Sequence, residues 1–222
     1  MVQMNNEQLI ALLGWDVVSS TSSTNEDRGC QQEELVLRGG QTATIYHNNN
    51  VPFRAFEHKA GKKHGIYAEL YDGELSQITH YVDDLEHGQS KQYSEGQLIG
   101  LYSLNMGTGI DVWFDAPDVL SEEHHMYQGK PHGPERWWNG DNQTIWREVH
   151  YVHGKRHGIE RQWNEDDDEQ PFLEEGYPKF WIDDQEVSKQ DYLRHDDVMP
   201  YDAKDDNPTR MPPAWQSVAT FT

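Results

Sequence analysis

The chain has 222 residues, 35% of them hydrophobic and 11% aromatic, and its 39 acidic against 18 basic residues give a formal net charge of −21. This charge argues against binding DNA, RNA or anionic lipid through a broad basic face. It is compatible with a basic protein partner or with mimicry of a nucleic acid. Cys30 is the only cysteine, which excludes an intrachain disulfide.

We expect a cytoplasmic protein. The Met1 end has no basic stretch followed by an apolar one, as a secretory signal would have. No stretch approaches the roughly 20 apolar residues that a membrane-spanning helix needs.

The N-terminal part is predicted to contain one short helix and a linker. Within residues 1–15, Asn5 can cap a helix and Gly14 can end it, and the apolar side is formed by Leu9, Ile10, Leu12 and Leu13. Residues 16–38 are rich in Ser, Thr, Asn and acidic side chains and are interpreted as a polar linker.

The middle of the chain, residues 39–182, contains an internal repeat. Glycines recur at spacings of 25, 23, 21, 24 and 25 residues, and three of them close the string Gly-Lys-x-His-Gly. The glycines are Gly40, Gly65, Gly88, Gly109, Gly133 and Gly158. The residues five positions later are all apolar or aromatic and are predicted to be buried: Ile45, Leu70, Tyr93, Phe114, Trp138 and Trp163.

Each unit is too short for a pair of helices and is predicted to be a β-hairpin. One example runs from Ile66 to Tyr71, turns at Asp72-Gly73, and continues from Glu74 to Val82. Asp-Gly between two such runs is typical of a type I′ turn, in which both central residues have positive φ. The predicted fold is mainly β, an elongated single antiparallel meander sheet of about twelve strands, with short helices near both ends.

The C-terminal part, residues 183–222, is predicted to hold a short helix and an acidic, Pro-rich tail. Ser188 to Asp191 has the pattern of a capping box that opens a helix to about His195. Beyond Asp196 the chain is expected to lie extended along the surface, where Trp215 fixes it.

The string from Tyr151 to Gly158 resembles the core of a MORN repeat, and the unit from His64 to Gly88 resembles the MORN-variant repeat of YwqK-type antitoxins. The resemblance covers roughly residues 40–182, and the unit at Gly109 departs from it because Thr108 replaces the histidine. It implies an elongated antiparallel sheet used for protein contacts and, for the variant group, a role in neutralising a toxin.

The sequence predicts no metal site, no cofactor and no catalysis. Equivalent histidines, such as His80, His125 and His150, lie two strands apart in a meander, roughly 10 Å, whereas a zinc–nitrogen bond is about 2.1 Å. Nucleophile-elbow, Walker A, dinucleotide-binding and zincin motifs are absent.

The leading functional hypothesis is a non-catalytic antitoxin or immunity-type protein that inhibits a basic partner protein. Trp137 and Trp138 are adjacent and must point to opposite faces of a strand, and Trp138 belongs to the apolar column, so Trp137 is expected to be exposed. The predicted partner-binding residues are Trp113, Trp137, Trp146, Asp166, Asp167 and Asp168. Two alternatives stay open: an acidic DNA-mimic inhibitor encoded by a phage or mobile element, and a passive MORN scaffold.

Overall fold

The computed structural model describes residues 3–25, 29–164, 171–215, 217 and 218. In these residues the chain is mainly β, its sheets are antiparallel and its helices are few and short. This agrees with the predicted fold class. The chain divides into two compact units, residues 1–106 and 107–222.

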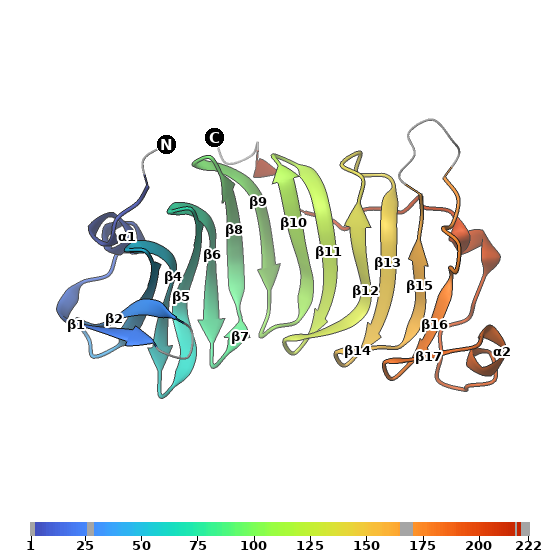
Figure 1. The fold of residues 1–222 in the computed structure, drawn as a ribbon, viewed down its shortest axis with the longest axis horizontal. Helices are drawn as coiled ribbons and strands as arrows, with labels where there is room; N and C mark the ends of the chain where they lie inside the picture. The colour runs from blue at the N-terminus through green and yellow to red at the C-terminus, as the bar shows by residue number, and fades with distance from the viewer. Residues whose placement is uncertain (1–2, 26–28, 165–170, 216, 219–222) are drawn as a thin grey trace. The chain divides into compact units, whose positions relative to one another are not determined.

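The first unit contains one helix and an antiparallel sheet in which consecutive strands pair in the order β1-β2-β3-β4-β5-β6-β8-β9, with β7 on β6 (Figure 1). The elements are α1 (Asn6–Leu13), β1 (Val17–Asn25), β2 (Cys30–Leu37), β3 (Thr42–Asn48), β4 (Val51–Lys59), β5 (Lys62–Tyr71), β6 (Glu74–Val82), β7 (Leu85–Glu86), β8 (Gly88–Ser94) and β9 (Gln97–Leu104).

The second unit contains a sheet in the order β10-β11-β12-β13-β15-β16-β17, with β14 on β13 (Figure 1). The elements are β10 (Gly109–Ala116), β11 (Val119–Tyr127), β12 (Lys130–Trp138), β13 (Ile145–Val152), β14 (Lys155–Arg156), β15 (Gly158–Gln162), β16 (Lys179–Ile182), β17 (Gln185–Val187), α2 (Lys189–Tyr192) and the 3₁₀ turn η1 (Ala203–Asp206). The sheet continues past residue 182, where the sequence predicted its end.

The expectation of one continuous meander is wrong, because β9 and β10 belong to different sheets. The Lys-x pair of the Gly-Lys-x-His-Gly string continues the ladder past the turn: Lys155 and Arg156 pair with Val152 and Tyr151, and Lys62 and Lys63 pair with Lys59 and His58. Between Gly107 and Gly109 there is one residue where that string has three. The residues that would carry the ladder across this position are therefore missing.

The expectation of a polar linker over residues 16–38 is also wrong. Residues 17–25 and 30–37 form the hairpin β1–β2, and β2 pairs along its length with β3. Leu35 and Leu37 are buried in the core of the first unit. Ser and Thr suit a half-exposed strand as well as a loop, so composition alone pointed to the wrong structure.

The first core lies between α1 and one face of the sheet. Asn5 caps the helix in a capping box with Gln8, and Gly14 ends it at a φ of 69°, as the sequence predicted. Leu9 and Leu13 of the helix pack against Leu35, Ile45 and other buried residues of the sheet.

Burial of the apolar column is confirmed at five of its six positions, and Tyr93 is half-buried. A register shift falls between the fourth and fifth residues after Gly65, Gly88, Gly109 and Gly133. After Gly40 the corresponding shift lies between Tyr46 and His47, the sixth and seventh residues. Gly40 is therefore two residues out of register with the other glycines, although Ile45 still lies on the buried face.

Candidate functional site

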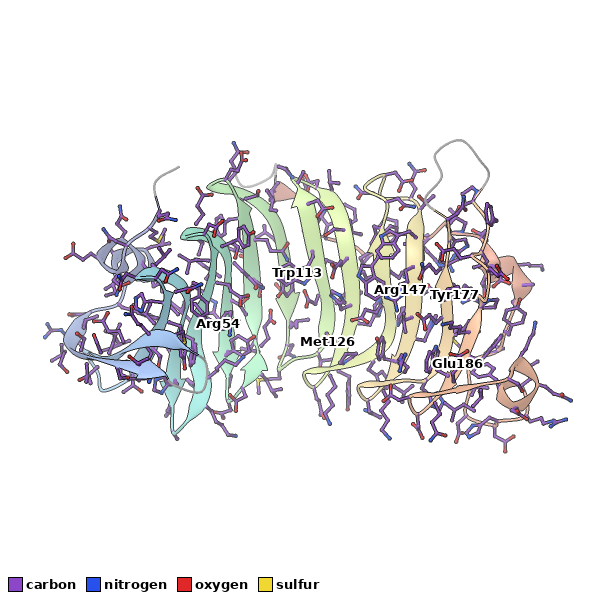
Figure 2. All side chains as sticks on the ribbon, in the orientation of Figure 1. Arg54, Trp113, Met126, Arg147, Tyr177 and Glu186 are labelled. Carbon is purple, nitrogen blue, oxygen red and sulfur yellow. The ribbon has the colours of Figure 1, made fainter. Side chains whose placement is uncertain are left out.

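One face of the second sheet carries a row of directly paired residues on neighbouring strands. Trp113 on β10 lies opposite Glu122 on β11, Glu122 lies opposite Trp137 on β12, and Trp137 lies opposite Arg147 on β13. Directly opposed residues of a sheet project from the same face. All four are half-buried; Trp113 and Arg147 are labelled in Figure 2.

Trp137 and Trp138 project from opposite faces, as predicted. Trp138 is 4% exposed and belongs to the core. Trp137 lies on the face of the row, where it is half-buried rather than exposed as expected.

Trp146 joins this row because β13 has a register shift. Trp137 pairs with Arg147 but Trp138 pairs with Ile145, so Trp146 is the extra residue of a β-bulge. Its ring lies 6.0 Å from that of Trp137, tilted by 47°. Trp113 lies two strands from Trp137, with Glu122 paired between them. We call Trp113, Glu122, Trp137, Trp146 and Arg147 the aromatic row.

Arg147 contacts both Trp137 and the buried Glu160. The sequence analysis did not predict this residue as part of the site. Its guanidinium carbon lies 4.9 Å from the ring centre of Trp137, a cation–π contact. Its Nη2 donates to Oε1 of the buried Glu160 at 2.8 Å. Trp181 donates to the other oxygen of that carboxylate at 2.8 Å.

Acidic side chains border the row around His124. The imidazole lies 3.1 Å from Glu122, 3.7 Å from Glu135 and 3.9 Å from Asp111. Burial, the largest influence, lowers the pKa of His124, but the hydrogen bond to Glu122 and the charges of Asp111 and Glu135 outweigh it and raise the pKa. The ring meets Trp137 edge-on at 6.5 Å.

The opposite face of the sheet carries a row of alternating charges. Glu123, Arg136, Glu148 and Arg161 are paired in register across four strands. Arg136 Nε donates to Glu148 at 2.8 Å and its Nη1 donates to Glu123 at 3.1 Å. Three of these carboxylates and guanidiniums are almost fully buried, so their role is structural.

The C-terminal segment covers this charged face. Arg210 donates to both oxygens of Glu148 at 3.1 and 3.0 Å, and Asp206 accepts from Arg161 at 2.8 Å. Trp215 donates to Asp118 at 3.3 Å and its ring meets that of Phe114 edge-on at 6.0 Å. Among the described residues, the aromatic row therefore lies on the less covered face of the second sheet.

The predicted residues Asp166, Asp167 and Asp168 lie outside the described residues. In the DNA-mimic hypothesis two other acidic runs, Asp183-Asp184 and Asp205-Asp206, would stand in for phosphates, and at least one residue of each makes contacts within the protein. Asp184 forms a hairpin turn and accepts a hydrogen bond from the Arg156 backbone at 2.9 Å. Asp206 binds Arg161 and accepts from the Tyr201 hydroxyl at 2.6 Å.

Two of the histidines considered as metal ligands pack against glycines instead. A Cβ on Gly133 would lie 2.9 Å from that of His125, and one on Gly158 would lie 2.6 Å from that of His150. In the described parts of the chain, no cluster of three or more His, Cys, Asp or Glu side chains could hold a metal ion. Nor does any helix there have the length and apolar character to cross a membrane.

Comparison of the sequence with protein-family models and with curated proteins finds no match in either set.

Proposed function

We propose that this chain is a non-catalytic protein-binding module that inhibits a basic partner protein, as an antitoxin or immunity protein does. The observation that carries the proposal is the Trp137–Trp146 pair, half-buried and bordered by Glu122 and Asp111 on one face of the sheet. Tryptophan and tyrosine dominate the energetics of protein interfaces, and acidic neighbours complement a basic partner.

The resemblance to MORN-variant repeats fits this proposal. Glycines of the repeat string have φ of 109° at Gly65, 117° at Gly133 and 135° at Gly158. Each stands against the side chain eight residues earlier, namely Glu57, His125 and His150. This shared contact supports reading the hairpins as copies of one unit, a framework that such proteins use for protein contacts.

Mimicry of DNA is the less favoured alternative. It needs carboxylates displayed to solvent like phosphates, whereas Asp206 binds Arg161; Asp184 is held in a turn by the Arg156 backbone, but its side chain stays exposed. A partner that releases this protein when offered duplex DNA would favour mimicry instead.

The proposal can be tested by capture from cells of the native host. The parent chain should retain a basic protein that Trp137→Ala captures poorly. Phe172→Ala is the matched control, because Phe172 is 52% exposed in the same unit and lies outside the aromatic row. Equal capture by parent and Trp137→Ala would overturn the assignment of the interface to this row.

A further inference from the structure

One short stretch of the first unit, residues 54–63, is rich in basic residues for so acidic a chain. Arg54, Lys59, Lys62 and Lys63 are four of only 18 in the whole chain. The single acidic residue between them, Glu57, accepts a hydrogen bond from Trp15 Nε1 at 2.6 Å. Trp15 belongs to the core beneath α1, so Glu57 is directed to the other face of the sheet.

A hollow lies beside these residues, over strands β3 to β5. Its volume is ≈ 460 Å³, and its walls include Tyr46, Arg54, Phe56, His58, Lys63 and Tyr67. Arg54, labelled in Figure 2, stands on this sheet. The volume falls within the range of about 300–1,000 Å³ that is typical of small-molecule sites. We call this hollow the basic groove.

Two cationic side chains, Arg54 and Lys63, both lie near the ring of Tyr67 in the basic groove. Arg54 Cζ lies 6.0 Å and Lys63 Nζ lies 5.3 Å from the ring centre of Tyr67. Arg54 is also paired with Glu69 at 2.6 Å. The Lys63 ammonium lies 3.9 Å from the ring centre of Tyr81, and among the described residues it forms no ion pair with a carboxylate.

In the part of the chain that the structure describes, the half-buried Lys63 therefore has no carboxylate in direct contact with its amine. Burial, the largest influence, lowers the pKa of this amine and the Arg54 cation lowers it too, while the more distant charges of Asp84, Glu86 and Glu69 act in the opposite direction without outweighing them. A bound anion in direct contact with Lys63 would be favoured by the same Coulomb interaction.

The rest of the groove suits an aromatic ligand with donor groups. The rings of Tyr46, Phe56 and Tyr67 form a line on neighbouring strands, with centroids 5.9 and 6.2 Å apart and planes inclined by 29° and 22°. Ring edges carry partial positive charge and pack well against another ring or an anion. Glu34 and Asp84 also line the groove, where they can accept hydrogen bonds but would repel a polyanion.

We propose that the basic groove binds a small organic anion with one anionic group, an aromatic ring and hydrogen-bond donors, of the size of a nucleoside monophosphate. The anionic group lies between Lys63 and Arg54, and the ring lies against Phe56 and Tyr67. This site is separate from the aromatic row and does not depend on its role.

The test is calorimetric titration of the full chain at low salt with adenosine monophosphate, with adenosine alone and with inorganic phosphate. The nucleotide should bind with a submillimolar Kd, at least about tenfold more tightly than either part alone. Lys63→Met should weaken nucleotide binding by about tenfold or more, the loss expected for one charge-assisted contact.

Lys59→Met is the matched control, since Lys59 is an exposed lysine on β4 outside the groove, and it should bind like the parent. Circular dichroism of both variants checks that the fold is retained. Three results would overturn the proposal: no nucleotide binding, phosphate binding as tightly as the nucleotide, or equal effects of the Lys63 and Lys59 substitutions.

Discussion

At the scale of single residues, alternation along a strand predicted part of the candidate site. The adjacent pair Trp137 and Trp138 had to divide between the two faces, and it does. The same rule would separate Trp146 from Arg147, yet both contact Trp137, because a bulge shifts the register at Ile145. A bulge depends on how two strands pair, so one strand's sequence does not reveal it.

The structure explains why residue 158, one of the regularly spaced positions, is a glycine. Gly158 has a φ of 135°, and a Cβ there would lie 2.6 Å from that of His150. Gly158→Ala should therefore lower the free energy of unfolding by about 1–3 kcal/mol, through both strain and overlap. Chemical denaturation followed by tryptophan fluorescence measures this loss.

Gly140→Ala is the control for this substitution. Gly140 also has a positive φ, 66°, but an added Cβ would meet only Val119 at an ordinary 3.6 Å. Gly140→Ala should lower the free energy of unfolding by less than Gly158→Ala does, because it adds backbone strain without a steric overlap. Equal losses for the two variants would show that contact with His150 does not constrain the glycine.

At the scale of elements, the sequence correctly predicted the features that depend on only a few neighbouring residues. The cap at Asn5, the end at Gly14 and the Asp72-Gly73 turn, with φ of 49° and 78°, were all predictable from a few residues. The hairpin β1–β2 was not, because its strands are defined by pairing with β3 and by the burial of Leu35 and Leu37. A Ser- and Thr-rich run carries no local sign of such a partner.

The docked C-terminal segment makes the second unit sensitive to acid. Burial, the largest influence, would raise the pKa of Glu148, but the hydrogen bond from Arg210 and the charges of His150, Arg210 and Arg136 lower it to about 2. A carboxyl with a depressed folded pKa stabilises fully above its ordinary pKa of 4.5. That contribution is lost as the pH falls from 4.5 towards 2.

Arg210→Met should raise the pKa of Glu148 and shift acid unfolding of this unit to higher pH. It should also destabilise the chain at neutral pH by about 1–3 kcal/mol, the loss of charge-assisted hydrogen bonds, because Arg136 and Arg161 still pair with Glu148. Acid unfolding can be followed by tryptophan fluorescence, to which Trp163 contributes; its Nε1 donates to the Asp206 carbonyl at 2.8 Å.

The exposed pair of Arg194 with Asp191 supplies the comparison for this variant. Arg194→Met should leave the acid transition in place, since a solvent-exposed pair contributes little. An acid transition that Arg210→Met does not move would contradict the role given to the tail.

At the scale of the whole molecule, periodicity predicted antiparallel hairpins but not their division into two sheets. The relevant signal was present in the shortened string from Gly107 to Gly109, which lacks the Lys-x pair. The meaning of this irregularity depends on knowing that the Lys-x pair continues the ladder past the turn, as β14 does on β13. The spacing of the glycines showed that this unit is irregular, but it did not show that β9 and β10 would belong to different sheets.

Net charge is the other property of the whole molecule that bears on function. With a formal charge of −21, the chain should attract a basic partner over long distances, so association should slow as salt screens the field. Contacts of the tryptophan rings are short-ranged and should govern dissociation, which then depends less on salt.

The most direct test of the protein-binding proposal is surface-plasmon kinetics of the captured partner against the parent, Trp137→Ala and Phe172→Ala at two ionic strengths. The association rate of all three chains should fall with salt to a similar extent. Trp137→Ala alone should dissociate faster, by about tenfold or more as expected for an interface hot spot, while its melting temperature stays close to that of the parent. If Trp137→Ala binds and dissociates like the parent at both ionic strengths, the aromatic row is not the interface.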